Sequence, residues 1–290
     1  MHDFNPKGLR RMLSLRQFPL FDTADLDEVA TVAENLVETS IPAGTIVASR
    51  GVRMHGVHLI LDGHIETRPR GQHWGPRSVF GALEVFADRE AAHTAVAATD
   101  LRTLHLSGSE VGELLEDNFG VLLAAVRELA SRLLVAAPLT SRPTQPVPCS
   151  GPLDLVERLI VLRQQLPFAS ARLQALATLA HASDEVLWPA HSTIVRTGDA
   201  ATSAFVIVDG AAVARRGDTV HTLGPGSPIG HLETLAGVQH GMTVETTLPV
   251  RALRSSGTAI LDVLEDHTDV ALAMMATFSG ALLDATARFN

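Results

Sequence analysis

Apolar and polar residues alternate along the chain with two different periods, and each period predicts a different element. Apolar residues recur at helical spacing over 26–33 and again over 173–180, so we expect an amphipathic helix at each place. Short apolar runs follow at 57–61 and 204–208. Both runs end in Asp-Gly, a dipeptide that supplies the positive φ angles of a tight turn, so each predicts a strand that leads into a hairpin.

Each half of the sequence closes with a second helical pattern. These patterns cover 111–135 in the first half and 260–283 in the second half. Ser107 and Glu110 have the spacing of a capping box, so we expect them to cap the first of these helices. Short strands bounded by turns favour a β-roll or a barrel.

The sequence repeats itself once over nearly its whole length. A shift of 147 residues aligns Phe21 with Phe168 and Gly51 with Gly198, and after two inserted residues the shift becomes 149. Further identical pairs are Leu15 and Leu162, Ala30 and Ala177, Pro42 and Pro189, Gly63 and Gly210, Gly75 and Gly224, Gly81 and Gly230, Leu83 and Leu232, and Glu116 and Glu265. A register held for so long indicates a duplicated domain and not a short solenoid repeat.

A proline-rich stretch separates the two copies. Residues 137–152 are APLTSRPTQPVPCSGP, in which the prolines forbid a continuous helix and favour an extended spacer. We therefore expect a first domain at 1–136, a linker at 137–152 and a second domain at 153–290. With 290 residues, 46% of them hydrophobic, the chain is long enough for two packed cores.

Composition and charge narrow the function classes. The net charge is −9 and no basic run stands out, which is unlike a protein that binds nucleic acid. No run of 18 apolar residues occurs and the first residues lack the layout of a signal peptide, so we expect a cytoplasmic protein with no membrane partner. Cys149 is the only cysteine and lies in the proline-rich stretch, where we expect an inert thiol.

Several segments resemble the cyclic-nucleotide-binding domain family. They are the Ile-Pro-Ala-Gly-Thr opening strand at 41–45, the glycines 12 residues apart at 51 and 63 and at 198 and 210, and the glycine-containing approaches to a cassette at 75–81 and 223–230. The resemblance covers nearly the entire chain. It implies a mixed α+β, mainly β fold, with two tandem β-rolls of the double-stranded β-helix or jelly-roll type. Each roll would be flanked by N-terminal and C-terminal helices.

In that family a phosphate-binding cassette runs from Gly-Glu-Leu to Arg-Ala-Ala-Thr. Backbone N–H groups at the start of a short helix point at the phosphate, and the arginine adds a two-pronged, charge-assisted contact. The glutamate accepts a hydrogen bond from the ribose hydroxyl. The glycine lets the backbone approach the ligand closely.

Both copies keep the spacing of this cassette and lose its charged pair. Ala82 and Ala91 stand at the glutamate and arginine positions of the first copy, and His231 and His240 stand there in the second copy. The resemblance implies that the ligand-binding residues are Gly81, Ala82, Leu83, Ala91, Ala92 and Thr94 in the first copy and Gly230, His231, Leu232, His240, Gly241 and Thr243 in the second copy.

These losses predict weak nucleotide binding. Removing one partner of a buried charge-assisted contact costs about 2 to 5 kcal/mol, and about 1.4 kcal/mol is a factor of ten in affinity. We therefore expect neither copy to bind cAMP or cGMP tightly, with a cyclic nucleotide or another small anion left open as the ligand.

Three alternatives would rescue a charged site. Glu84 and Arg89 could replace the lost pair, although they are five residues apart. Protonated His231 and His240 could hold an anion near pH 6, or the two imidazoles could contribute to a zinc site that still lacks further ligands. The simpler expectation is a pocket filled by neighbouring side chains, with no metal bound.

Enzymatic and DNA-binding functions are disfavoured. A cupin-type metal centre would need more ligands than His55 and His58, which are simply a turn residue and a strand residue by their positions. Too few residues follow the second copy for a helix-turn-helix. Tandem rolls also resemble kinase regulatory subunits, and Arg10 and Arg11 before Ser14 resemble a kinase-substrate segment imperfectly, with a basic helix face as the simpler interpretation.

Two non-catalytic functions remain. One is a regulatory sensor that transmits occupancy through its C-terminal helices to a partner protein. The other is a ligand-free interaction scaffold. In both we expect the partner to be another protein, and a homo-oligomer is also open. The apolar stripe that would pack internally or against a partner is Leu122, Leu123, Val126, Leu129 and Leu133.

Overall fold

The computed structural model describes residues 6–22, 24–69, 71–136, 151–165, 168–169 and 171–288. Most of the predicted linker at 137–152 lies outside the described residues, and so does Cys149. The domain boundary placed there, and the expected inert thiol, therefore stay predictions.

Contacts along the chain divide it into two compact units. The first unit contains the residues up to Ala125 together with Phe278–Asn290, and the second contains Val126–Thr277. Helix α5 (Phe119–Ala136) therefore begins in the first unit and ends in the second, whereas α10 (Thr268–Arg288) begins in the second and ends in the first. Each unit thus includes the end of the closing helix of the other repeat.

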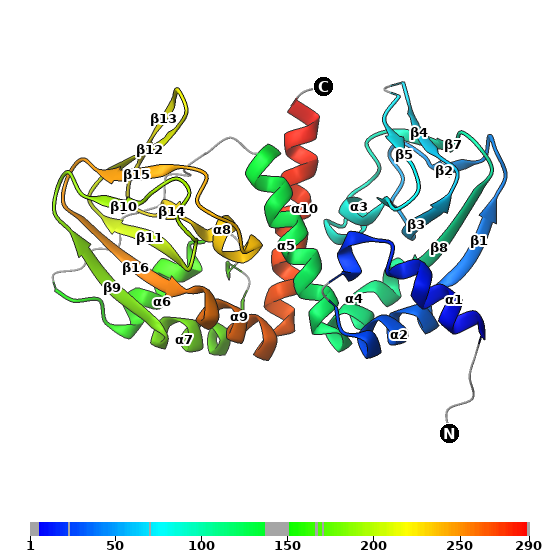
Figure 1. The fold of residues 1–290 in the computed structure, drawn as a ribbon. Coiled ribbons are helices and arrows are strands. Elements are labelled where there is room, and N and C mark those ends of the chain that lie inside the picture. Colours follow the sequence, from blue (N-terminus) through cyan, green and yellow to red (C-terminus); the bar gives the residue numbers. More distant parts are fainter. Residues whose placement is uncertain are drawn as a thin grey trace. The chain divides into compact units, whose positions relative to one another are not determined.

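The first unit is a roll of two four-stranded antiparallel sheets, in the strand orders β1-β8-β3-β6 and β2-β7-β4-β5 (Figure 1). Its helices before the roll are α1 (Pro6–Leu15), the short 3-10 helix η1 (Pro19–Phe21) and α2 (Leu26–Asn35). Its strands are β1 (Val37–Ile41), β2 (Ile46–Ala48), β3 (Gly56–Asp62), β4 (Ile65–Arg68), β5 (His73–Trp74), β6 (Val79–Phe80), β7 (Thr94–Ala97) and β8 (Leu101–Ser107). Helix α3 (Ala82–Phe86) lies between β6 and β7, and α4 (Gly108–Asp117) leads into α5.

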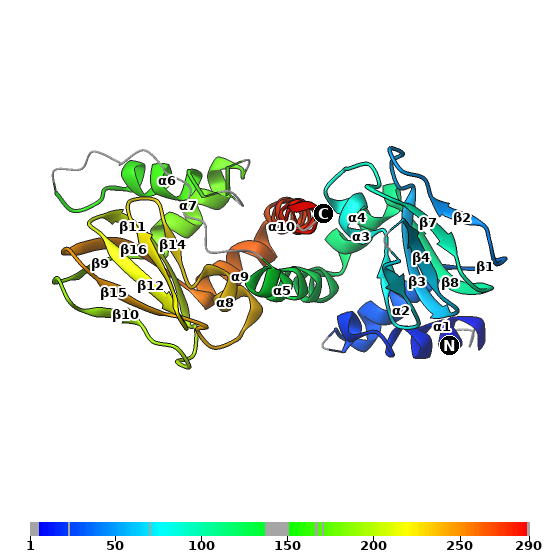
Figure 2. The same cartoon turned by 90° about the horizontal axis from the view of Figure 1, so that it is seen from above.

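The second unit repeats this plan, with the sheets β14-β11-β16-β9 and β10-β15-β12-β13. Helices α6 (Leu155–Arg163) and α7 (Leu173–His181) precede its roll and lie over the sheet that contains β9 and β11 (Figure 2). Its strands are β9 (Ser183–Trp188), β10 (Thr193–Val195), β11 (Ser203–Asp209), β12 (Ala212–Arg216), β13 (Thr219–Leu223), β14 (Pro228–Ile229), β15 (Thr243–Thr246) and β16 (Val250–Ser256). Helix α8 (His231–Ala236) lies between β14 and β15, and α9 (Gly257–Asp266) leads into α10. The predicted fold class is confirmed.

The two Asp-Gly dipeptides form corners between sheets, so the predicted hairpins are wrong. Strands β3 and β4 belong to different sheets, and so do β11 and β12. Gly63 and Gly210 do have positive φ angles, 82° and 94°. A Cβ at Gly210 would lie 2.9 Å from the Pro249 carbonyl carbon and still closer to its oxygen. Glycine is needed at this corner because another backbone segment passes directly against it.

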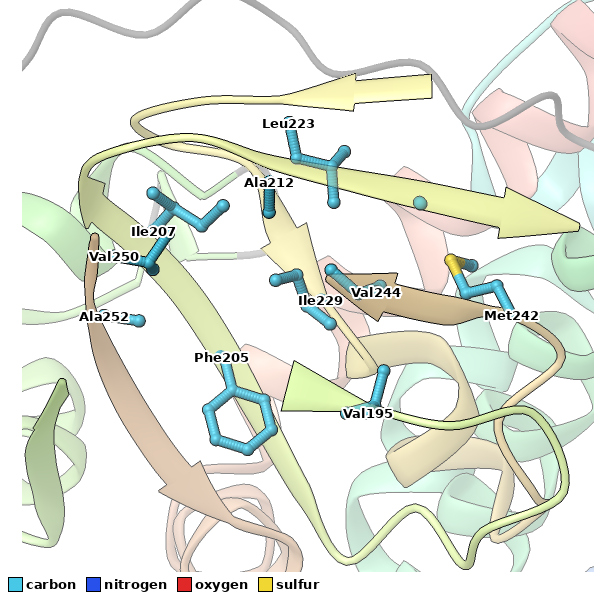
Figure 3. Packing of buried hydrophobic residues seen from close by; sticks show 11 residues of the cluster. Val195, Phe205, Ile207, Ala212, Leu223, Ile229, Met242, Val244, Val250 and Ala252 are labelled. Atoms are coloured by element: carbon cyan, nitrogen blue, oxygen red, sulfur yellow. The ribbon is translucent and has the colours of Figure 1, made fainter. Parts of the chain in front are cut away.

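The interior of each roll is filled by apolar side chains that alternate along the strands. In the second unit, Phe205 and Ile207 of β11 point into a cluster that also contains Val244 and Ala252 (Figure 3). Each core also contains one pair of aromatic rings that pack edge to face. The ring centroids lie 5.3 Å apart for Trp74 and Phe80 and 5.6 Å apart for Trp188 and Phe205. The matched pairs show that the two repeats share one packing plan.

One arginine at the same repeat position caps the second helix of each unit. Arg11 donates to the carbonyl oxygens of Ala33 and Leu36 at 3.0 and 2.5 Å, beyond which α2 gives way to β1. Arg158, 147 residues later, donates to Ser183 at 2.6 Å. These contacts satisfy carbonyls that a helix end leaves without partners. Arg11 therefore has a structural use, which favours the helix-face interpretation of the basic segment.

The predicted capping box at Ser107 does not form. Ser107 is the N-cap residue of α4, but its hydroxyl donates to the Glu110 carboxylate at 2.6 Å and does not cap a backbone N–H. In the second unit, Ser256 accepts from the backbone N–H of Ala259 at 3.1 Å. Alanine at 259, the repeat position of Glu110, leaves the serine hydroxyl free to cap the helix.

Helix α10 is long and apolar enough over Thr268–Ala287 to cross a membrane, with a mean hydropathy of 1.5. Length and composition of one helix are weak support for a span, because the core helix of a soluble protein passes the same test. Met274, Met275 and Phe278 of this helix are buried in the fold.

Candidate ligand-binding cassettes

The first cassette begins at Gly81, which caps the N-terminus of α3. Gly81 has a φ of 85°, in the left-handed region. A Cβ at this position would lie 2.6 Å from the Met54 Cε atom and 3.0 Å from the Gly56 carbonyl oxygen. The glycine is therefore required by both its backbone angle and its surroundings, and the chain's own Met54 covers it.

The predicted site residues of the first cassette surround this turn but supply no charge at the two key positions. Ala82 and Leu83 are half-buried in α3, Ala91 is 6% exposed, and Ala92 is exposed. The backbone of Ala91 is held on both sides, since its carbonyl accepts from Gly51 at 2.9 Å and its N–H donates to Val52 at 3.0 Å. The loop therefore keeps a fixed path without an arginine.

The threonine that follows each cassette has a structural partner. Thr94 Oγ1 accepts from the backbone N–H of Arg50 at 3.3 Å. Thr243 Oγ1 accepts from the N–H of Thr197 at 3.1 Å, and Arg50 and Thr197 are themselves 147 residues apart. Both threonines tie their strand to the loop opposite, which explains their presence without a ligand.

Arg89, one of the two residues considered as a replacement pair, is engaged elsewhere in the first unit. Its guanidinium forms an ion pair with Asp284 near the end of α10, with Nη2 and Oδ2 3.5 Å apart. The Asp284 carboxylate raises the pKa of Arg89 by accepting its hydrogen bond. Burial raises the pKa of Glu84, the other member of the pair. The geometry therefore does not favour this pair as a substitute for the lost glutamate and arginine.

The second cassette has the same frame with histidines in it. Gly230 caps α8 with a φ of 72°. A Cβ at Gly230 would lie 2.8 Å from Cε1 and 3.5 Å from Nδ1 of His240, and 3.2 Å from the Ser203 carbonyl oxygen. The imidazole at the arginine position therefore packs directly on the cassette glycine.

Burial decides the charge of His231. Removal from water lowers the pKa of His231 to about 4. A lowered pKa disfavours the hypothesis that His231 holds an anion in its protonated form near pH 6, and the anion site itself stays a prediction. A neutral imidazole cannot supply the charge of the missing group.

Among the residues that the structure describes, three buried polar atoms around α8 have no hydrogen-bond partner. They are Nδ1 of His240, Oε1 of Glu233 and Oγ1 of Thr234, with His240 only 5% and Glu233 only 3% exposed. Glu233 lies in the first turn of α8, three residues after the cap residue Gly230.

Arg216 lies beside the second cassette, although the cassette motif does not include it. Arg216, at the end of β12, lies with its guanidinium Nη2 3.4 Å from the place where a side chain at Gly241 would begin. Its Nη1 donates to the Leu134 carbonyl oxygen in α5 at 3.2 Å. Gly241 itself is exposed, Leu232 is half-buried, and Thr243 opens β15. Arg216 comes from a neighbouring strand, which a linear motif does not include.

The two histidines considered for a metal centre are placed differently from each other. His55 is exposed, whereas His58 of β3 packs against His105, with ring centroids 4.7 Å apart. Burial, and then the neighbouring His105, lower the pKa of His58 to about 4. Within the described part of the chain, no group of three or more His, Cys, Asp or Glu side chains is arranged to hold a metal ion.

Two eight-stranded rolls, each with a short glycine-capped helix before its seventh strand, define a protein with two nucleotide-cassette modules. A model of the cyclic nucleotide-binding domain matches residues 38–118 and 185–267, which together exceed half of the chain. The protein belongs to the cyclic nucleotide-binding domain family. A comparison with curated protein sequences finds no match.

Solved structures with a similar fold include regulatory domains of protein kinases. The regulatory domain of protein kinase A from Toxoplasma gondii, with cAMP, is 14% identical over 99% of this chain and 100% of that chain, with a TM-score of 0.37. The regulatory subunit of a cAMP-independent protein kinase A from Trypanosoma brucei is 16% identical over 93% and 94%, with a TM-score of 0.37. The sensor domain of a transcriptional regulator from Pseudomonas aeruginosa is 20% identical over 44% and 90%, with a TM-score of 0.40.

Proposed function

We propose that this protein is a non-catalytic regulatory sensor whose two cyclic-nucleotide-binding modules do not bind cAMP or cGMP tightly. The observation that carries the proposal is the contact between His240 and Gly230. The side chain that replaces the arginine lies on the cassette glycine itself, and the nearby Glu233 carboxylate is buried without a partner at Oε1. A phosphate at this cassette would find no arginine to contact, because His240 stands at the arginine position.

The first cassette supports the same proposal by a different route. Ala82 and Ala91 cannot accept from a ribose or contact a phosphate with their side chains, and Ala91 is buried. The nearest arginine in the sequence, Arg89, already has an ion-pair partner in Asp284. The module therefore keeps the cassette backbone, and its nearby arginine pairs with a carboxylate of the same chain.

Restoring the charged pair tests the cause of weak binding. The variants are Ala82→Glu with Ala91→Arg in the first cassette, and His231→Glu with His240→Arg in the second. Matched controls carry glutamine at the same positions, which adds polar side chains without the charge. Calorimetry on the full chain should show at least about a 30-fold gain in cAMP affinity for the charged variants over the glutamine controls, since each charged contact contributes about 2 kcal/mol or more. Micromolar binding by the unmodified protein, or no gain in the charged variants, would overturn the proposal.

A ligand-free scaffold is the second candidate, and one observation favours it. Side chains of the chain itself, Met54 and His240, cover the glycine of each cassette. The apolar stripe considered for partner binding is mostly buried, since Leu122, Val126, Leu129 and Leu133 are at most 5% exposed and Leu123 is half-buried. That stripe therefore belongs to the fold, and a scaffold would use another surface.

A thermal-shift screen separates the two candidates. A ligand that binds only the folded state raises the midpoint of unfolding, by about 2.7 kcal/mol of stability at 100 times its dissociation constant. A reproducible upward shift with a nucleotide or another small anion supports the sensor. No shift across the panel supports the scaffold, with its partner a protein.

A further inference from the structure

A contact in the first unit links its cassette to the end of the last helix. Arg89 follows α3 directly in the cassette loop, and Asp284 lies in the last two turns of α10, 195 residues further along the chain. Their side chains form an ion pair and are 45% and 57% exposed. The pair therefore lies at the surface, where it can open without unfolding the roll.

The arginine also packs against the helix beside its ion-pair partner. Gly280 lies one turn before Asp284, and positions four residues apart share one face of a helix. The guanidinium Nη2 and Cζ of Arg89 lie 3.5 and 3.8 Å from the place where a side chain at Gly280 would begin. These are ordinary van der Waals distances, so the guanidinium packs closely against this face of the helix beside Asp284.

The second unit contains a corresponding contact. Arg216 lies against Gly241 of the second cassette, with its guanidinium Cζ 3.9 Å from the place of the missing side chain. It donates to the carbonyl oxygen of Leu134 in the last turn of α5. Carbonyls in the last turn of a helix lack helical partners and carry its negative partial charge, so a guanidinium is a favourable partner.

The repeat register places the accepting helix ends at neighbouring positions, whereas the two arginines come from different positions of the repeat. A shift of 149 residues places Leu134 of α5 opposite position 283 of α10, next to Asp284. The first unit includes the end of α10, and the second includes the end of α5. An arginine next to each cassette therefore contacts a helix end. Arg89 of the first repeat contacts the end of α10, which follows the second repeat, and Arg216 of the second repeat contacts the end of α5, which follows the first.

We propose that these arginines are latches that dock the exchanged helix ends, and that the Arg89–Asp284 latch makes the first cassette responsive to the state of α10. Helix α10 is continuous from Thr268, in the second unit, to Arg288, in the first. In this proposal, a change at one end of α10 reaches the other end along the same continuous helix. This inference does not depend on whether either cassette binds a nucleotide.

Asp284→Asn in the full chain tests the first latch by hydrogen exchange over 278–288. A carboxylate in the last turns of a helix opposes the helix dipole, so without a latch this substitution would leave protection equal or higher. The latch predicts the opposite sign, a loss of protection of about fivefold from an ion pair worth about 1 kcal/mol. Asp184→Asn is the matched control, because Asp184 pairs with Arg254 in the second unit at similar exposures of 66% and 44%.

A charge exchange identifies the partner. Arg89→Asp alone should lower protection over 278–288, and Arg89→Asp combined with Asp284→Arg should recover most of it. Arg216→Met should lower protection over 126–136 while leaving 278–288 unchanged. The proposal is overturned if Asp284→Asn behaves like Asp184→Asn, or if the exchanged pair protects the helix end no better than Arg89→Asp alone.

Discussion

His240 lies with its imidazole Cε1 2.8 Å from the point where a side chain at Gly230 would begin. The cassette glycine has a φ of 72°, a backbone conformation that residues other than glycine adopt only at an energetic cost. The two residues therefore constrain each other. The backbone of the second cassette can keep its path only with glycine at 230 while the imidazole occupies this place.

Gly230→Ala is expected to destabilise the second unit by about 2 to 4 kcal/mol, because the added Cβ strains the backbone and meets both His240 and the Ser203 carbonyl oxygen. Gly198→Ala is the control, since Gly198 has a φ of 90° but nothing within 4 Å of an added Cβ. It should cost only about 1 to 2 kcal/mol. Urea unfolding followed by tryptophan fluorescence measures both. Equal losses in the two variants would contradict the close contact.

Stability should fall as the solution becomes acidic, and His231 should contribute to the slope. Its pKa is about 4 in the folded chain, against 6.5 as its ordinary value. Between these pH values the unfolded chain binds more protons, so the free energy of unfolding decreases as pH falls from about 6.5 to 4 and is unaffected by this group above 6.5. His58 has a lowered pKa as well and acts in the same direction.

His231→Gln should therefore flatten the pH dependence by an amount on the order of 2 kcal/mol between pH 6.5 and 4, since each unit of pKa shift corresponds to about 1.4 kcal/mol. Urea unfolding at a series of pH values measures the slope. His55→Gln, at an exposed position, serves as the control and should leave the slope unchanged. An unaltered slope in His231→Gln would show that this side chain is not buried in its neutral form.

Arg11→Met should lower the stability of the first unit by about 1 to 3 kcal/mol. The substitution keeps an apolar stem but leaves the carbonyls of Ala33 and Leu36 without their charged donor. Arg10 is exposed on the same helix, and Arg10→Met should change stability by less than about 0.5 kcal/mol. Thermal unfolding of the two variants compares them directly. A loss in Arg10→Met as large as in Arg11→Met would remove the proposed capping role.

The duplicated pattern predicted the fold because each local signal appears twice. The helices at α2 and α7, the strands β3 and β11, and the glycines of both cassettes all follow from residues close together in the sequence. The Asp-Gly corners did not, since a positive φ at Gly63 suits both a hairpin and a crossing between sheets. Which of the two occurs depends on strand pairings that lie far apart in the chain.

The partners of the cassettes were harder to predict for the same reason. The motif spacing located Ala82, Ala91, His231 and His240, but it contained no sign of Asp284, which bonds Arg89 from 195 residues away. Arg216 reaches Gly241 from a neighbouring strand, and Leu134 accepts its hydrogen bond from a helix end. A backbone carbonyl has no signature in a sequence, so only the folded chain shows where these arginines go.

Isothermal titration calorimetry of cAMP and cGMP into the full, unmodified chain tests the central claim most directly. Loss of the charged pair predicts no saturable heat in the micromolar range for either nucleotide, with any binding at about millimolar concentration or weaker. A dissociation constant in the micromolar range, for either nucleotide at either module, would contradict the account.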